Sequence, residues 1–131
     1  MIKIVYFSNY SGNTKKFVEK LDEDSIRIPI NQKNTDPIIV TQRYVLFVPT
    51  YGGGSDKSAI PRQVKTFLNV ESNRNNLVAV VGLGNTNFGK DYCKAAELIA
   101  AKTGVPILGR VEIFGTEEDT ITIKERLAML V

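Results

Sequence analysis

Three short apolar runs, at residues 2–7, 44–48 and 77–81, constrain the fold of this chain more than any other feature. They are rich in β-branched residues and apolar at nearly every position, which is typical of strands buried on both faces of a parallel sheet. Each run ends in glycine or small polar residues, and a segment whose apolar residues have helical spacing follows. The pattern therefore predicts parallel strands joined by helical crossovers.

The remaining elements complete this alternation. Shorter strands are predicted at residues 25–28 and 105–114, and helices at residues 15–21, 60–69, 90–103 and from Gly115 onward. Residues 30–42 hold turn-forming residues and predict no helix. Right-handed crossovers then favour a doubly wound α/β fold, with a five-stranded parallel sheet of order 2-1-3-4-5 in a three-layer αβα arrangement. No linker or repeat interrupts the chain, so we expect residues 1–131 to form a single domain.

The loop after the first strand predicts an anion site. It consists of Ser8, Asn9, Tyr10, Ser11, Gly12, Asn13 and Thr14. A strand that ends in small polar residues and turns into a helix points several free backbone N–H groups at one place, where the helix dipole adds positive potential. Such residues are also ordinary helix caps, but one cap accounts for only one or two of them. We therefore expect this loop to hold a phosphate.

Several familiar phosphate motifs are absent. No Lys follows Gly12 in P-loop order, and no G-x-G-x-x-G follows the first strand. The first strand also lacks the acidic pair of a phosphorylation receiver, and the loop lacks the cysteine of a low-molecular-weight phosphatase. These absences argue against nucleoside triphosphates, dinucleotides and phosphoenzyme chemistry.

Two further loops are predicted at the same edge of the sheet, because carboxyl ends of parallel strands lie together. The second loop contains Pro49, Thr50, Tyr51, Gly52, Gly53 and Gly54, and the third spans residues 82–89, including Gly84, Asn85, Asn87, Phe88 and Gly89. Glycines permit close approach to a planar ligand and a peptide flip, and amides suit the polar edge of a heterocycle. Phe88, Tyr51 and Tyr92 are candidates for stacking on a ring. A surface turn for the glycines and a packing role for Phe88 remain alternatives.

Composition narrows the function further. The chain has 17 basic and 14 acidic residues, a net charge of +3, and no basic cluster, which argues against nucleic-acid binding and favours acidic ligands or partners. It has no histidine, so we expect no metal site. Its one cysteine, Cys93, falls on the inward face of the predicted helix at 90–103 and predicts a buried apolar role. Short apolar runs and the lack of a signal peptide predict no membrane association and a cytoplasmic location.

Three motifs in the same order resemble those of the NrdI family of flavodoxin-like proteins. They are PTYGGG at residues 49–54, GNTNFG at 84–89 and GTEED at 115–119. Residues 8–14 also resemble the flavodoxin phosphate loop, and the short segment 30–42 fits the smaller family. The resemblance covers essentially the whole chain, and it implies a flavodoxin-like fold with flavin mononucleotide (FMN) as cofactor.

The resemblance also implies a redox function. Proteins of this family activate class Ib ribonucleotide reductase: their reduced flavin reacts with dioxygen, and the superoxide or peroxide reaches the dimanganese small subunit, which forms a tyrosyl radical. By the same motifs, residues 8–14 hold the phosphate, Thr50 to Gly54 lie along the N5 edge of the ring, and Asn85, Asn87 and Phe88 line its other side. An unidentified flavin reductase would supply electrons, so the chain is expected to be an accessory protein rather than a stand-alone enzyme.

Two alternatives from other classes stay open at this point. One is an electron-transfer flavodoxin that serves another reductase. The other is a non-redox module of the same fold.

Overall fold

The computed structural model describes residues 2–31, 38–51 and 59–130. Within these ranges five strands form one parallel sheet of order β2-β1-β3-β4-β5. The strands are β1 (Lys3–Phe7), β2 (Ser25–Ile28), β3 (Tyr44–Pro49), β4 (Leu77–Gly84) and β5 (Ile107–Glu112). This topology confirms the predicted doubly wound order 2-1-3-4-5.

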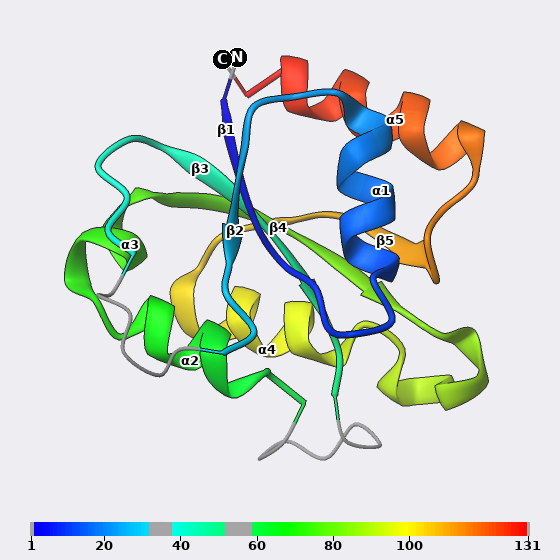
Figure 1. The fold of residues 1–131 in the computed structure, drawn as a ribbon, viewed down its shortest axis with the longest axis horizontal. Helices are drawn as coiled ribbons and strands as arrows, with labels where there is room; N and C mark the ends of the chain where they lie inside the picture. Colours follow the sequence, from blue (N-terminus) through cyan, green and yellow to red (C-terminus); the bar gives the residue numbers. More distant parts are fainter. Residues whose placement is uncertain (1, 32–37, 52–58, 131) are drawn as a thin grey trace.

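Helices cover both faces of the sheet, as Figure 1 shows. The helices α1 (Asn13–Leu21) and α5 (Glu117–Ala128) lie on one face, and α2 (Arg62–Leu68) and α4 (Lys94–Thr103) lie on the other. A short helix, α3 (Glu71–Asn76), follows α2, and a 3-10 segment, η2 (Thr86–Asp91), connects β4 to α4. The three-layer αβα arrangement is therefore as predicted. Searching the described part of the chain for a helix long and apolar enough to cross a bilayer finds none.

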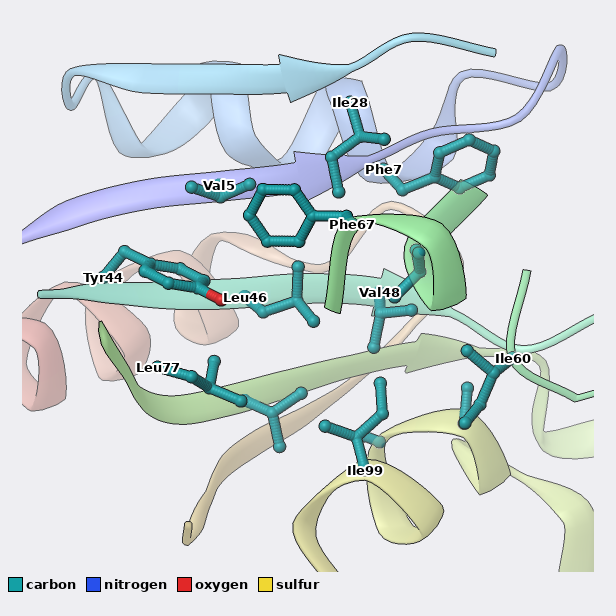
Figure 2. Packing of buried hydrophobic residues seen from close by; sticks show 14 of the residues in the cluster. Val5, Phe7, Ile28, Tyr44, Leu46, Val48, Ile60, Phe67, Leu77 and Ile99 are labelled. Atoms are coloured by element: carbon teal, nitrogen blue, oxygen red, sulfur yellow. The ribbon is translucent and has the colours of Figure 1, made fainter. Parts of the chain in front are cut away.

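The alternation of side chains along the central strands divides the core into two layers. On β1, Val5 faces the layer under α2 and α4, whereas Ile4 faces the layer that contains Phe17 of α1. Figure 2 shows the first layer, which contains Phe67 of α2 and Tyr44 of β3. The two ring centroids are 5.7 Å apart at 80°, an edge-to-face contact. The central strands are therefore apolar at successive positions because both of their faces are buried.

The strand β4 is longer than predicted, because residues 82–84 belong to the strand and not to the loop that follows it. Helix α4 packs directly on this part of the strand. A Cβ atom on Gly82 would lie 2.8 Å from Cβ of Ala96 and 2.9 Å from Cβ of Cys93. The glycine therefore allows the helix to pack closely on the strand. The sequence prediction placed Gly82 in a loop because glycine is common in flexible turns.

Two other predicted boundaries are wrong for one reason, a residue with positive φ. Helix α4 begins at Lys94 and not near residue 90, because Gly89 (φ 59°) and Cys93 (φ 57°) have backbone angles that a right-handed helix cannot contain. Cys93 is buried as expected, but it precedes the helix. Likewise β5 ends at Glu112 and not at residue 114, because Ile113 has φ 56°.

Two helix boundaries have clear local causes. Gly104 ends α4 in the left-handed conformation, with φ 78°. Thr116 caps α5: its hydroxyl oxygen accepts from the N–H of Asp119 at 3.1 Å, and the Asp119 carboxylate accepts from the N–H of Thr116 at 2.9 Å.

The short helix α3 escaped prediction, and its buried Asn73 organises the loop before β3. The Asn73 side-chain oxygen accepts from the N–H of Val40 at 2.7 Å. Its amide nitrogen donates to the carbonyls of Ile38 at 2.8 Å and Phe67 at 2.9 Å. Residues 38–42 are therefore a packed loop, held by a side chain about 33 positions later.

We expect Asn73→Ala to lower the free energy of unfolding by about 3 kcal/mol, because it leaves the buried N–H of Val40 without its acceptor and removes the donor to the carbonyls of Ile38 and Phe67. Urea unfolding followed by circular dichroism measures this change. Asn75→Ala is the matched control on the same helix: Asn75 is exposed, and its replacement should alter stability by less than about 0.5 kcal/mol. Equal effects of the two substitutions would contradict the role given to Asn73.

Candidate functional site

A cavity of about 320 Å³ opens at the carboxyl edge of the sheet. Four strand ends contribute to it. Its lining residues are Asn9, Ser11, Asn13 and Thr14 after β1, Pro49 and Thr50 at the end of β3, Leu83, Gly84 and Asn85 at the end of β4, and Ile113 after β5. In Figure 1 the loop after β1 and the segment η2 lie at the same end of the sheet, in the lower right. The cavity thus forms where a doubly wound fold places its ligands.

The loop after β1 is a tight turn built on Asn9. The Asn9 side-chain oxygen accepts from the backbone N–H of Ser11 at 3.1 Å and from the Ser11 hydroxyl. The N–H of Gly12 donates to the carbonyl of Asn9 at 3.0 Å, and Gly12 itself has φ 73°. The left-handed glycine reverses the chain, so that α1 begins at once with Asn13.

The start of α1 has backbone N–H groups that could bind an anion. The N–H groups of Asn13 and Thr14 belong to the first turn, where no preceding helical carbonyl can accept from them. Later donors are already used: the N–H of Lys15 donates to Ser8 Oγ at 3.1 Å and the N–H of Lys16 to the carbonyl of Gly12 at 2.9 Å. Asn13 and Thr14 both line the cavity, so two backbone N–H groups and the positive end of the helix dipole lie at its wall.

Two residues of the predicted phosphate loop have other surroundings. Ser8 is fully buried, does not line the cavity, and caps α1 through its bond to Lys15. Tyr10 is 90% exposed and does not line the cavity either. Asn9, Ser11, Asn13 and Thr14 are the loop residues that the structure brings together.

The end of β3 supplies part of the second predicted loop. Thr50 accepts from the N–H of Ala95 at 2.9 Å through its hydroxyl, which ties β3 to the start of α4. Tyr51 packs edge-on against Phe7, with ring centroids 5.9 Å apart, so its ring is held by the core. Gly52, Gly53 and Gly54 lie outside the described residues.

The segment after β4 is fixed by two side chains. The Asn85 side-chain oxygen accepts from the N–H of Asn87 at 2.9 Å, which caps η2. The Glu112 carboxylate accepts from the N–H of Thr86 at 3.1 Å and from the Thr86 hydroxyl. Asn85 lines the cavity, whereas Asn87 is exposed and does not.

The sequence predicts three further site residues in the third loop and its helix, Phe88, Gly89 and Tyr92. Gly89 is exposed and does not line the cavity. Tyr92 is half-buried beside Gly84, and burial raises the pKa of its hydroxyl to about 12. The side chain of Phe88 is outside what the structure describes.

Sequence reasoning missed two apolar residues of the cavity wall. The sequence places Leu83 in a loop without a role and Ile113 next to the end of the predicted strand at 105–114. Isoleucine at residue 113 carries no signal of a left-handed backbone, so only the tertiary structure reveals that it lines the cavity.

Helix α1 is braced against the turn after β5. Lys20 Nζ donates to the carbonyls of Phe114 at 3.1 Å and Gly115 at 3.0 Å. The same ammonium group lies 4.9 Å from the centre of the Phe114 ring, a cation–π contact. The helix that provides the anion wall is thereby connected to the strand end that provides Ile113.

Comparison with known proteins identifies relatives over nearly the whole chain. A family model described as "NrdI Flavodoxin like" matches residues 5–125. Protein NrdI of Photorhabdus laumondii is 45% identical over 122 residues, covering 93% of this chain and 86% of that protein. Protein NrdI of Beutenbergia cavernae is 46% identical over 128 residues, covering 97% and 91%.

Solved structures share the fold at low sequence identity. Oxidised flavodoxin 2 of Bacillus cereus matches with a TM-score of 0.62 at 16% identity, over 100% of both chains. Two-electron reduced Megasphaera elsdenii flavodoxin matches with a TM-score of 0.60 at 17% identity, over 98% of this chain and 99% of that chain. A Fusobacterium nucleatum flavodoxin variant bound to flavin mononucleotide has a TM-score of 0.52 at 17% identity, over 97% and 92%. These likenesses confirm the flavodoxin-like fold.

We expect Cys93 to be unreactive in the folded protein. Burial raises the pKa of its thiol to about 11, so at about pH 8 the group is both enclosed and protonated. Iodoacetamide should label it only after unfolding in urea. Between about pH 9 and 11 the unfolded chain loses this proton and the folded chain keeps it, so the free energy of unfolding should fall as pH rises.

Cys93→Ala is the control, since it removes the thiol contribution to that pH dependence and leaves the contributions of the tyrosines. Rapid alkylation of the folded protein at about pH 8 would contradict the prediction.

Proposed function

Since the chain belongs to the NrdI flavodoxin-like family, we propose that it binds FMN and acts as the redox activator of class Ib ribonucleotide reductase. The cofactor occupies the cavity at the carboxyl edge of the sheet. The activity is that of an accessory protein, whose product is an activated partner.

The observation that carries this proposal is the pairing of an anion wall with an apolar wall in one cavity. The lining includes Asn13 and Thr14, whose N–H groups at the start of α1 suit a phosphate monoester. It also includes Leu83 and Ile113 with the amide of Asn85, which suit a flat ring with a polar edge. These donors and walls fit FMN, which carries a phosphate and a tricyclic ring.

The residues of this chain bind and orient, while the redox chemistry belongs to the cofactor. The chemistry supplied by bound FMN is the passage of electrons to dioxygen, which yields superoxide or peroxide. Thr50, through its bond to Ala95, and Asn85, through its cap on η2, hold the walls beside the ring. Of the other predicted contacts, Gly52, Gly53 and Gly54 are proposed for the N5 edge.

The proposed partners follow from the family resemblance. They are the dimanganese small subunit of the reductase, dioxygen, and a flavin reductase that supplies electrons. We place the encounter in the cytoplasm, without nucleic acid or membrane. The net charge of +3 favours acidic partner surfaces.

We expect Thr14→Val to weaken the binding of the phosphate without affecting the binding of the ring. Loss of a hydroxyl that faces the anion wall should weaken FMN binding about tenfold, because hydrogen bonds to charged groups contribute about 1.5–3 kcal/mol. Affinity for riboflavin, which has the ring and no phosphate, should not change. Quenching of flavin fluorescence on titration of the apoprotein measures both affinities.

Thr66→Val is the matched control, since Thr66 is an exposed helical threonine on α2 whose hydroxyl donates to the carbonyl of Arg62 at 3.1 Å. Equal loss of FMN and riboflavin affinity in Thr14→Val would place the phosphate elsewhere. If the unaltered protein failed to bind FMN, the proposed function itself would be contradicted.

A reconstitution experiment tests the activity. The reduced protein is mixed with metal-free class Ib small subunit, Mn²⁺ and dioxygen, and electron paramagnetic resonance detects the tyrosyl radical. We expect the radical to form with reduced protein and to be absent when the oxidised protein replaces it. Binding of FMN without radical formation would favour an electron-transfer flavodoxin for another reductase.

A further inference from the structure

We propose that Glu112 and Ile113, at the end of β5, form a clasp that builds the ring side of the FMN site before FMN arrives. In this clasp Ile113 is a ring-contact residue, and Glu112 is a positioning residue that acts through Thr86. The inference rests on the proposed function, because it concerns how the same cavity holds its ligand.

The backbone of Ile113 is the first observation. Its φ of 56° lies in the left-handed region, where a β-branched side chain is a genuine outlier. Hydrogen bonds on both sides hold it there: the N–H of Ile113 donates to the carbonyl of Gly84 at 2.8 Å, and the N–H of Gly115 donates to the carbonyl of Glu112 at 2.9 Å. The left-handed conformation is therefore imposed by these hydrogen bonds, against the intrinsic backbone preference of isoleucine.

The position of the Ile113 side chain is the second observation. It lines the cavity and remains 40% exposed, so a substantial part of its apolar surface is open to a ligand there. Glycine would adopt the same backbone without strain, so the isoleucine side chain is expected to make a contact that offsets the strain. An apolar ring in the cavity supplies the missing contact.

The third observation is the bond from Glu112 to Thr86. One carboxylate oxygen accepts both the N–H and the hydroxyl of Thr86, across 26 residues of sequence. Thr86 directly follows Asn85, which lines the cavity, and begins η2. The last residue of β5 and the residue after it thus hold the loop at Thr86 and the end of β4 at Gly84.

The clasp predicts opposite behaviour of stability and affinity in Ile113→Gly. Relief of backbone strain offsets the lost side chain, so the apoprotein should unfold at the same or a higher temperature. Affinity for FMN and for riboflavin should fall by the same factor, about tenfold, because the ring contact is common to both. Ile39→Gly, which removes a 61% exposed isoleucine from the loop at 38–42, is the control and should leave both affinities unchanged.

Variants of Glu112 test the positioning role. Glu112→Ala should weaken both ligands several-fold without changing the unfolding temperature, because the residue is exposed. Glu112→Gln should restore most of the affinity, since one amide oxygen can still accept both Thr86 donors. Glu125→Ala, an exposed glutamate on α5, is the control.

Fluorescence titration and thermal unfolding together decide the outcome. Wild-type affinity for both ligands in Ile113→Gly would overturn the clasp while leaving the proposed function intact. A lower unfolding temperature that accompanies the lost affinity would also overturn it, because the two residues would then be merely structural. Failure of the unaltered protein to bind FMN would instead remove the proposed function.

Discussion

The parallel pairing of β1, β3 and β4 determines the relative positions of the three strand ends that contribute to the cavity. Tyr6 pairs with Phe47, and Phe47 pairs with Val81, so the three strands end at nearly the same level. Their side chains are buried in two layers, which leaves no room for polar groups before the strands end. The polar residues of the cavity wall therefore follow the strands, and the sheet brings them together at one edge.

Much of this arrangement could be predicted from the sequence. The apolar runs at residues 2–7, 44–48 and 77–81 specified the strands because burial on both faces requires apolar residues at successive positions. The polar loop after the first run specified an anion wall, and four of its seven residues line the cavity. Their contacts with a ligand stay predictions, as do those of the glycines at 52–54.

The remaining features depend on contacts that a sequence does not display. Ile113 is left-handed because a neighbouring strand and a turn hold it, against its own preference. The fully buried Asn73 sits in a short helix of mostly polar residues, and only its bonds to a distant loop explain it. Ser8 looked like a ligand donor, yet its oxygen accepts from Lys15 and caps the helix. In each case a specific hydrogen bond of the folded chain outweighs the local signal, over long range for Ile113 and Asn73 and within seven residues for Ser8.

The bond from Lys20 to the turn after β5 has a consequence for ligand choice. It joins the helix that starts at the anion wall to the strand end that carries Ile113, so these two parts of the cavity are connected by a contact outside the sheet. A ligand with both a phosphate and a ring would have to match the distance between them. One whose linking chain is too short or too long could reach only one end.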